Sequence, residues 1–233
     1  KKGASVIFNP QKAFEGNEHF TMPFPEAGGM SQGYIGLHLE EALTNEIKKE
    51  GLEKEVITIL SRTLVDEKDP AFENPTKPIG NFMTEEEAEA TRKKGFTVIE
   101  DSGRGYRRVV ASPLPKEIIE INTINNLIAA GEVVITCGGG GVPVTKEGNS
   151  LKGIAAVIDK DFASSLLAQN INADLLIILT AVEKVAINFN TPDVEWLDHL
   201  TTSQAEEYIS QGHFAKGSML PKVQAALDFA SSN

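Results

Sequence analysis

The chain has 233 residues, of which 41% are hydrophobic and 24% charged, a composition typical of a globular protein with a sizeable core. Its net charge of −11 argues against a general nucleic-acid or anionic-membrane surface, since either would need clustered basic residues. Cys137 is the only cysteine and no apolar run reaches the roughly 20 residues of a membrane helix, so we expect a cytoplasmic protein without disulfides and without nucleic-acid or membrane partners.

In chain order, the first clear element is an amphipathic helix over residues 31–49, which Gly51 should end. Its apolar face would hold four residues at helical spacing: Ile35, Leu39, Leu43 and Ile47. A strand is expected next over residues 55–60, where apolar side chains first alternate and then run together.

Residues 66–115 differ from the rest of the chain in composition, with several prolines, several charges and short apolar runs. They predict a helix over residues 84–94 with Thr84 as its N-cap, followed by strands near residues 96–99 and 106–110. We interpret this block as a subdomain inserted into the main domain.

Beyond this block, strands and helices alternate regularly. The predicted elements are strands at residues 133–136, 175–179 and 185–189, and helices at residues 116–130, 162–171, 201–210 and 221–230. This rhythm predicts an α/β protein with a mainly parallel sheet and helices on both faces. Such sheets bind ligands beyond the carboxyl ends of their strands, where Thr180 and a glycine run are expected.

The glycine run follows the strand at residues 133–136 and has four members: Gly138, Gly139, Gly140 and Gly141. It is not a Walker A loop, which ends in Gly-Lys-Ser or Gly-Lys-Thr, and it lacks the spacing of the dinucleotide fingerprint. Its exposed N–H groups suit phosphate oxygens, although glycines also permit sharp turns and tight packing. Because four glycines exceed the need of one turn, we favour contact with phosphate or substrate.

Lys160 lies between Asp159 and Asp161 at an expected helix start. The two acids would suit a simple helix start, but a lysine is unfavourable near the positive end of a helix. A lysine that neutralises the charge of a transferring phosphoryl group explains the triplet better.

Two more lysines occupy stiff settings. Lys77 lies between two prolines, and Lys222 follows Pro221 at an expected first helical position. Each alone could be a solvated side chain, but together with Lys160 and the glycines they predict a protein that transfers phosphoryl groups.

Other reactive residues give weaker signals. The charged segment at residues 100–108 fits either a hairpin or a mobile anion-binding loop. Cys137 adjoins the glycines without an evident base, so we do not expect it to be catalytic. The histidines show no metal-ligand spacing, and we expect no protein-built metal site from them: His19, His38, His199 and His213.

Six motifs resemble, in the same order, those of the carbamate kinases, which belong to the amino acid kinase fold family. They lie at residues 30–36, 74–80, 100–107, 137–143, 157–161 and 212–222. The resemblance runs from about Met22 to the end. It implies that residues 1–233 form one domain, an open, mainly parallel sheet in a three-layer αβα sandwich, with residues 66–115 protruding over the substrate site.

The resemblance also implies an activity. Carbamate kinases form homodimers and reversibly transfer a phosphoryl group between ATP and carbamate, giving ADP and carbamoyl phosphate. Mg²⁺ is held mainly through the phosphates. In fermentative bacteria the reaction usually makes ATP from carbamoyl phosphate that arginine or purine breakdown supplies.

By position, the resemblance assigns roles to the charged residues. Lys160 would act at the transferring phosphate, Asp161 would orient the lysines, Lys222 would bind the nucleotide phosphates, and Lys77 would reach over carbamoyl phosphate. The residues implied at the nucleotide are Asp159, Thr180, Val182, Lys184 and Met219.

The sequence also departs from the family pattern. The family's opening strand, which ends in Gly-Gly-Asn-Ala, its His-Gly-Asn-Gly-Pro-Gln loop and its closing segment have no counterpart here, so we expect the natural protein to be longer. Two alternatives stay open: a sister kinase that acts on a carboxylate or nucleotide, and a non-catalytic relative that binds nucleotide or carbamoyl phosphate. The proline-flanked Lys77 argues against the first, and the intact lysines argue against the second.

Overall fold

The computed structural model describes residues 22–101, 103–215 and 217–232. These form two compact units, and the division lies between Lys160 and Asp161. The poorly matching residues 1–21 lie outside the described part of the chain. No described helix is long and apolar enough to cross a membrane.

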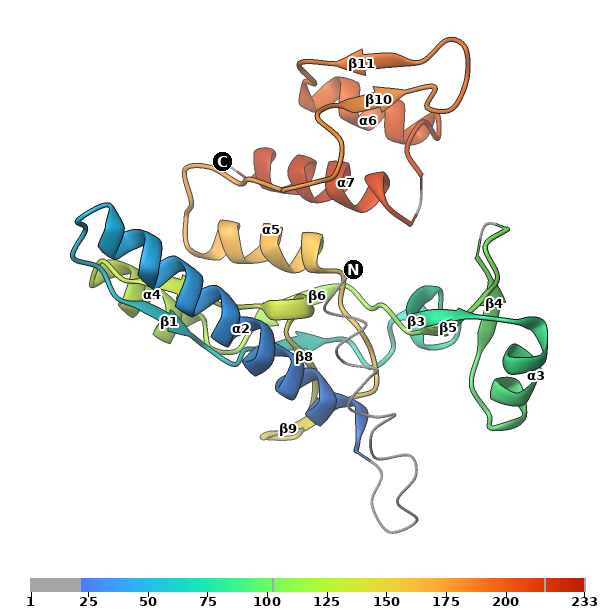
Figure 1. Cartoon of the computed structure of the whole chain (residues 1–233), viewed down its shortest axis with the longest axis horizontal. Helices are drawn as coiled ribbons and strands as arrows, with labels where there is room; N and C mark the ends of the chain where they lie inside the picture. The colour runs from blue at the N-terminus through green and yellow to red at the C-terminus, as the bar shows by residue number, and fades with distance from the viewer. Residues whose placement is uncertain (1–21, 102, 216, 233) are drawn as a thin grey trace. The chain divides into compact units, whose positions relative to one another are not determined.

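The first unit opens with the long helix α2, Phe24–Lys49 (Figure 1), which begins earlier than the predicted residue 31 and is followed by Gly51 at φ 68°. Its buried residues are small or polar for the most part: Phe24, Ala27, Ser31, Gln32 and Gly36. The predicted apolar face is only partly buried, since Leu39 and Leu43 are exposed. Gly36 explains the difference, because a Cβ there would lie 2.2 Å from the Thr58 Cγ2 atom, so the helix packs closely through glycine.

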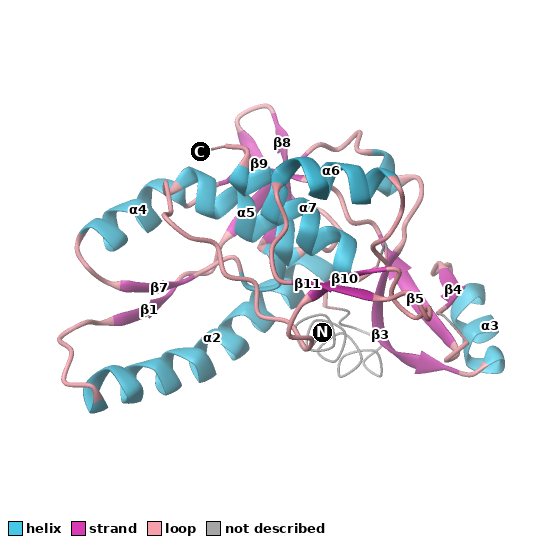
Figure 2. Ribbon diagram, turned by 90° about the horizontal axis from the view of Figure 1, so that it is seen from above, coloured by secondary structure: helices cyan, strands magenta, loops and turns pink. Residues whose placement is uncertain are grey.

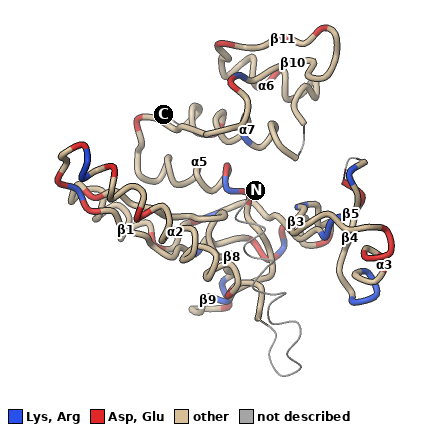
Figure 3. Tube along the Cα trace, in the orientation of Figure 1, with Lys and Arg blue, Asp and Glu red and all other residues tan. Residues whose placement is uncertain are grey.

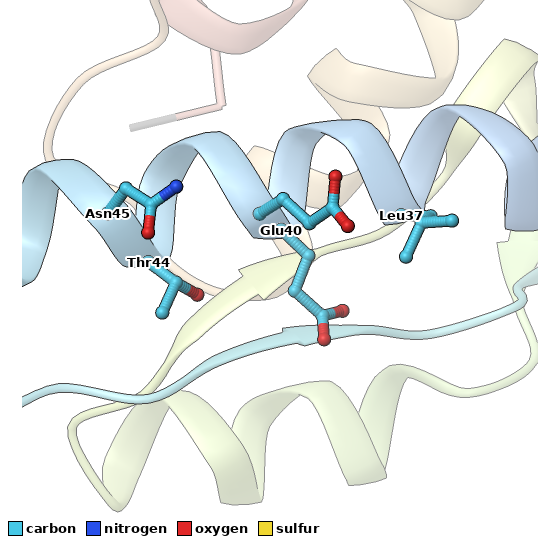
Figure 4. A pocket seen from close by; sticks show the side chains of 5 residues that line it. Leu37, Glu40, Thr44 and Asn45 are labelled. Atoms are coloured by element: carbon cyan, nitrogen blue, oxygen red, sulfur yellow. The ribbon is translucent and has the colours of Figure 1, made fainter.

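Two parallel strand pairs follow one another in this unit. Strand β1 (Val56–Thr58) pairs with β7 (Val133–Ile135), and β2 (Arg62–Val65) pairs with β8 (Val142–Glu147). Helices α2 and α4 flank the first pair on opposite faces (Figure 4), which makes a local helix–sheet–helix sandwich. Residues 59–61 connect β1 to β2, and the longer segment of residues 136–141 connects β7 to β8. The second connection contains the glycines.

The second pair belongs to a four-stranded sheet in the order β6-β2-β8-β9, where β6 is Pro115–Ile118 and β9 is Ser150–Gly153. Strand β6 corrects the predicted helix over residues 116–130, since helix α4 covers only Ile121–Ala129. The antiparallel pairing of β6 with β2 explains the change, because its hydrogen bonds replace those of the first helical turns.

The predicted subdomain contains the antiparallel sheet β3-β5-β4 with helix α3 against it (Figure 2). The elements are β3 (Lys77–Met83), α3 (Glu85–Lys93), β4 (Val98–Glu100) and β5 (Tyr106–Val110). Thr84 caps α3 in a reciprocal capping box with Glu87, as the sequence predicts. Acidic residues begin the helix and basic residues end it (Figure 3), which complements the helix dipole.

The base of the subdomain is fixed at two points. The Asp69 carboxylate accepts hydrogen bonds from the N–H groups of Ala71 and Leu114, so the two ends of the inserted segment are joined. An apolar cluster unites the subdomain strands with the main body: Phe24, Ala27, Ile79, Val110 and Val157. This cluster immobilises the start of β3, where Lys77 lies.

The second unit contains mainly helices and one hairpin. Helix α5 (Lys160–Asn170) begins at the boundary, and α6 (Thr202–Ser210) and α7 (Met219–Ala230) follow the hairpin of β10 (Val185–Ile187) and β11 (Glu195–Leu197). Thr201 caps α6 with a capping box. The unit has its own apolar cluster of buried residues: Ile187, Ala205, Phe214, Val223 and Leu227.

The predicted strand over residues 175–179 is wrong for the described structure. This segment has no strand assignment, and the side chains of Leu175, Ile177 and Leu179 are 69%, 69% and 90% exposed. No described strand pairs with it, and a strand needs a partner for its backbone hydrogen bonds. The α/β class is confirmed, but the sheets of the described residues are separate rather than one open sheet.

Candidate functional site

The glycine run forms a tight 3₁₀ turn, Gly138–Gly140, in the gap between β7 and β8. Two of its N–H groups serve the turn itself, since Gly140 donates to the Cys137 carbonyl at 2.9 Å and Gly141 donates to the Gly138 carbonyl at 3.2 Å. The N–H groups of Gly138 and Gly139 donate to no described residue. The N–H groups of Gly140 and Gly141 are therefore used within the turn, whereas a role for those of Gly138 and Gly139 at phosphate stays a prediction.

Steric constraints explain why the loop needs glycine. Gly140 and Gly141 have φ values of 100° and 85°, which residues with a Cβ rarely adopt. A Cβ on Gly140 would lie 2.4 Å from the Ile158 carbonyl oxygen, and a Cβ on Gly141 would lie 2.1 Å from the Thr63 hydroxyl oxygen. The sequence left open that the glycines serve tight packing rather than ligand contact. At Gly140 and Gly141 the backbone does pack too closely for any larger residue.

Three buried polar side chains connect the loop to α2 and β2 through hydrogen bonds. Gln32 donates to the Ser61 carbonyl at 3.0 Å and accepts from the Ser61 N–H at 2.9 Å. The Ser61 hydroxyl accepts from the Cys137 N–H at 2.7 Å, and the Thr63 hydroxyl donates to the Gly140 carbonyl at 2.9 Å. We call Gln32, Ser61 and Thr63 the loop clamp.

The loop clamp was not predicted from the sequence. Its members lie far from the glycines along the chain. The pairing of β2 with β8 brings Ser61 and Thr63 to the glycines, and the packing of α2 against the turn brings Gln32. The one available signal was the spacing of Ser61 and Thr63, two hydroxyl side chains that flank Arg62.

Cys137 begins the glycine turn with φ 52°, an uncommon value for a residue with a side chain. Its thiol is buried, and burial raises the pKa of the Cys137 thiol above its ordinary value of 9.0. A neutral thiol at neutral pH agrees with the prediction that this residue is not a nucleophile.

In the first unit, Lys77 and Asp159 form an ion pair. The Lys77 ammonium lies 2.5 Å from a carboxylate oxygen of Asp159, and their side chains are 29% and 11% exposed. Lys77 begins β3 at the base of the subdomain, and Asp159 ends the buried run of Ala156, Val157 and Ile158. Asp159, which the resemblance assigns to the nucleotide, thus contacts a lysine, and its nucleotide contact stays a prediction.

In the second unit, Asp161 and Lys222 form a similar pair. The Lys222 ammonium donates to both carboxylate oxygens of Asp161 at 2.8 and 3.1 Å, and both side chains are largely buried. Lys222 is the fourth residue of α7. Pro221 is therefore the third helical residue rather than the first, because the helix already begins at Met219.

Lys160 is the first residue of α5 and is exposed. Its sequence neighbours Asp159 and Asp161 each hold a lysine from a distant part of the chain, one 82 residues before and one 61 residues after. Each acid therefore contacts a lysine in addition to lying at the helix start.

The residues implied at the nucleotide lie in several settings of the second unit. Lys184 forms a surface ion pair with Asp198 at 2.6 Å, and Met219 packs against the apolar cluster of this unit. Thr180 is exposed and Val182 is half-buried, both in the segment without strand structure. These placements leave the nucleotide assignment a prediction.

The charged segment at residues 100–108 is a hairpin organised by Asp101. Arg104 and Arg107 donate to the two oxygens of that carboxylate at 3.0 and 3.3 Å. Burial opposes ionisation, but these hydrogen bonds and charges outweigh it and lower the pKa of Asp101 below 3.8. Both guanidinium groups also lie over the ring of Phe82.

Within the described ranges, no three His, Cys, Asp or Glu side chains converge to hold a metal ion. A shallow depression on α2 (Figure 4) is lined by Leu37, Glu40, Glu41, Thr44 and Asn45. Its two glutamates and lack of cations would repel an anion.

Comparisons with known proteins agree with this picture. The sequence pattern described as "Amino acid kinase family" matches residues 27–233. The "Carbamate kinase-like protein YqeA" of Escherichia coli (strain K12) is 59% identical over 211 residues, which cover 91% of this chain and 68% of that protein. The "Carbamate kinase" of Clostridium perfringens is 52% identical over 211 residues, covering 90% of this chain and 67% of that protein.

A solved structure gives the same answer. "Carbamate kinase from Giardia lamblia bound to AMP-PNP" superposes with a TM-score of 0.87 at 42% identity and covers 98% of this chain. The match covers 73% of the Giardia chain, so this chain spans between two thirds and three quarters of these three relatives. By sequence and by structure, the chain belongs to the amino acid kinase family, in its carbamate kinase group.

Proposed function

We propose that the protein catalyses reversible phosphoryl transfer between ATP and carbamate, which yields ADP and carbamoyl phosphate. The observation that carries the proposal is a pair of ion pairs: Asp159 holds Lys77 in the first unit, and Asp161 holds Lys222 in the second. Carboxylates that accept hydrogen bonds from lysines orient the positive groups, which is what the transfer of a negatively charged phosphoryl group requires.

In the forward reaction, a carbamate oxygen forms a bond with the γ-phosphorus of ATP while the bond from that phosphorus to the β–γ bridging oxygen breaks. Carbamate is already an anion, so no general base is needed. Lys160 and Lys222 would counter the charge on the transferred group, and Lys77 would bind the carbamoyl phosphate end. The N–H groups of Gly138 and Gly139 would donate to phosphate oxygens.

Mg²⁺ would accompany the nucleotide as in other phosphoryl transfers, where it neutralises charge on the phosphates. The acids nearest the lysines, Asp159 and Asp161, are engaged in ion pairs, so the nucleotide phosphates would supply most of its ligands. The relative bound to AMP-PNP supports an ATP or ADP substrate. The segment that contains Thr180, Val182 and Lys184, with Met219, is proposed to bind the nucleotide.

A second candidate is a non-catalytic protein that binds nucleotide or carbamoyl phosphate. The observation that favours it is the 59% identity to a protein named carbamate kinase-like. A third, a sister kinase for another carboxylate, has no comparable support. We also propose that the protein is a homodimer, as the resemblance implies, and light scattering of the purified protein would measure this.

The substrate test offers ADP and Mg²⁺ with carbamoyl phosphate, N-acetylglutamyl phosphate or UDP in parallel and follows ATP. Rapid ATP formation from carbamoyl phosphate alone supports the proposal. ATP formation from one of the other donors would assign the protein to a sister kinase. Nucleotide binding by calorimetry without turnover of any donor would favour the non-catalytic candidate.

A further inference from the structure

The ion pair of Lys77 and Asp159 lies between two rigid supports of the first unit. Val157, two residues before Asp159, belongs to the same apolar cluster as Ile79 and Val110 of the subdomain. The Val157 N–H also donates to the Ala111 carbonyl at 3.0 Å, directly after β5. The backbones that carry Lys77 and Asp159 are therefore fixed relative to each other by packing and hydrogen bonding.

The position of the Lys77 backbone does not by itself set the position of its ammonium group. The backbone is placed by the pairing of Lys77 with Val110 in the β3–β5 register. The side chain is 29% exposed, and its four-carbon stem is flexible, so an ammonium group can take several positions around one backbone site. The contact that sets the position of the ammonium group is the bond to Asp159.

This bond leaves donor capacity on the lysine. An ammonium group carries three N–H donors and Asp159 accepts one of them, so two remain for the oxygens of an anionic ligand. The carboxylate thus orients Lys77 without exhausting its hydrogen bonds.

We propose that Asp159 is a positioning residue for Lys77, which directs this ammonium group toward the acyl phosphate substrate rather than toward the nucleotide. The inference rests on the proposed phosphoryl transfer and gives Asp159 a different task from the nucleotide contact that the resemblance implies. Asp161, the acid on the other side of Lys160, holds Lys222 in the second unit. The two acids would then serve two different lysines.

The test uses Asp159→Asn in the complete protein, with KM measured separately for carbamoyl phosphate and for ADP. The amide removes the charge and keeps the size. We expect kcat/KM for carbamoyl phosphate to fall by up to about 10²-fold, as for a misplaced binding group, while the KM for ADP changes little. Asp159→Glu should recover part of the loss.

A double-mutant cycle separates positioning from general structure. If Asp159 acts through Lys77, the Asp159→Asn change should add little to the loss caused by Lys77→Met. The matched control is Glu117→Gln, which removes the surface ion pair of Glu117 with Lys146 in the same unit and should leave both KM values unchanged.

Three results would overturn the inference: equal losses for both substrates, full additivity with Lys77→Met, or a higher KM for ADP alone. If Asp159→Asn does not fold, Asp159→Glu and Lys77→Arg carry the same comparison. If the wild-type protein forms no ATP, the proposed function fails, and calorimetry of carbamoyl phosphate with these variants still tests whether Asp159 positions Lys77.

Discussion

Gln32 of α2 binds both backbone groups of Ser61, with an N–H···O distance of 2.9 Å in one direction and 3.0 Å in the other. Both residues are buried, and Ser61 in turn accepts the Cys137 N–H at the start of the glycine turn. A side chain on a helix thus sets the position of a loop that begins 106 residues later in the sequence (138 − 32).

Removing the Ser61 hydroxyl should destabilise the protein. Ser61→Ala leaves the buried Cys137 N–H without its acceptor, and an unpaired buried donor costs about 1–3 kcal/mol. Urea denaturation measures the change in the free energy of unfolding. The control Ser210→Ala removes an exposed hydroxyl on α6 and should change stability by much less. Equal effects of the two substitutions would refute the loop clamp.

Gly140→Ala should be more damaging than Gly148→Ala. Both glycines have positive φ, which costs a residue with a Cβ roughly 1–2 kcal/mol at either site. Only Gly140 adds a clash, since its Cβ would lie 2.4 Å from the Ile158 carbonyl oxygen, whereas Gly148 faces open space. Thermal denaturation of the two variants measures the difference, and similar melting temperatures would contradict the packing described here.

Lys160→Met should lower kcat on the order of 10²-fold or more, because one stabiliser of the transferring charge is lost. The measurement is the steady-state rate of ATP formation at saturating substrates. Lys152→Met serves as the control, since Lys152 is exposed and pairs only with Glu147 among the described residues. An unchanged rate in Lys160→Met would remove this lysine from the proposed mechanism.

The hairpin at residues 100–108 should lose stability in acid. The arginines lower the pKa of Asp101, so the ionised carboxylate favours the folded state at pH values above its ordinary pKa of 3.8. That contribution should disappear as the pH falls through the lowered folded pKa. Asp101→Asn should therefore be less stable than wild type at neutral pH, and the gap should close in acid.

Denaturation curves of both proteins from pH 7 to pH 3 check this expectation. A gap that stays constant over this range, or one that widens in acid, would show that the carboxylate charge is not what orders Arg104 and Arg107.

Local signals predicted the elements that local chemistry determines. Thr84 followed by acidic residues identified α3, and the strand predicted at residues 106–110 has the bounds of β5. The four glycines identified the loop. The strands β2, β6 and β8 were missed because each depends on a partner distant in sequence, and periodicity within one segment does not carry that information.

For the candidate site, too, the sequence identified individual residues but not the contacts between distant ones. Lys77, Lys160 and Lys222 stood out from their neighbours in sequence, and so did the acids of the triplet. The pairings of Asp159 with Lys77 and of Asp161 with Lys222 join segments 82 and 61 residues apart, so only the folded chain reveals them. Gln32, Ser61 and Thr63 gave no catalytic signal because their partners are backbone groups.

The rate of ATP formation from ADP, Mg²⁺ and carbamoyl phosphate, measured with a luciferase assay on the purified complete protein, decides whether the protein transfers the phosphoryl group. We expect sustained turnover that Lys160→Met reduces by about 10²-fold or more. Tight nucleotide binding with no ATP formed above the uncatalysed rate would contradict it and identify a protein that binds these ligands without transferring the phosphoryl group.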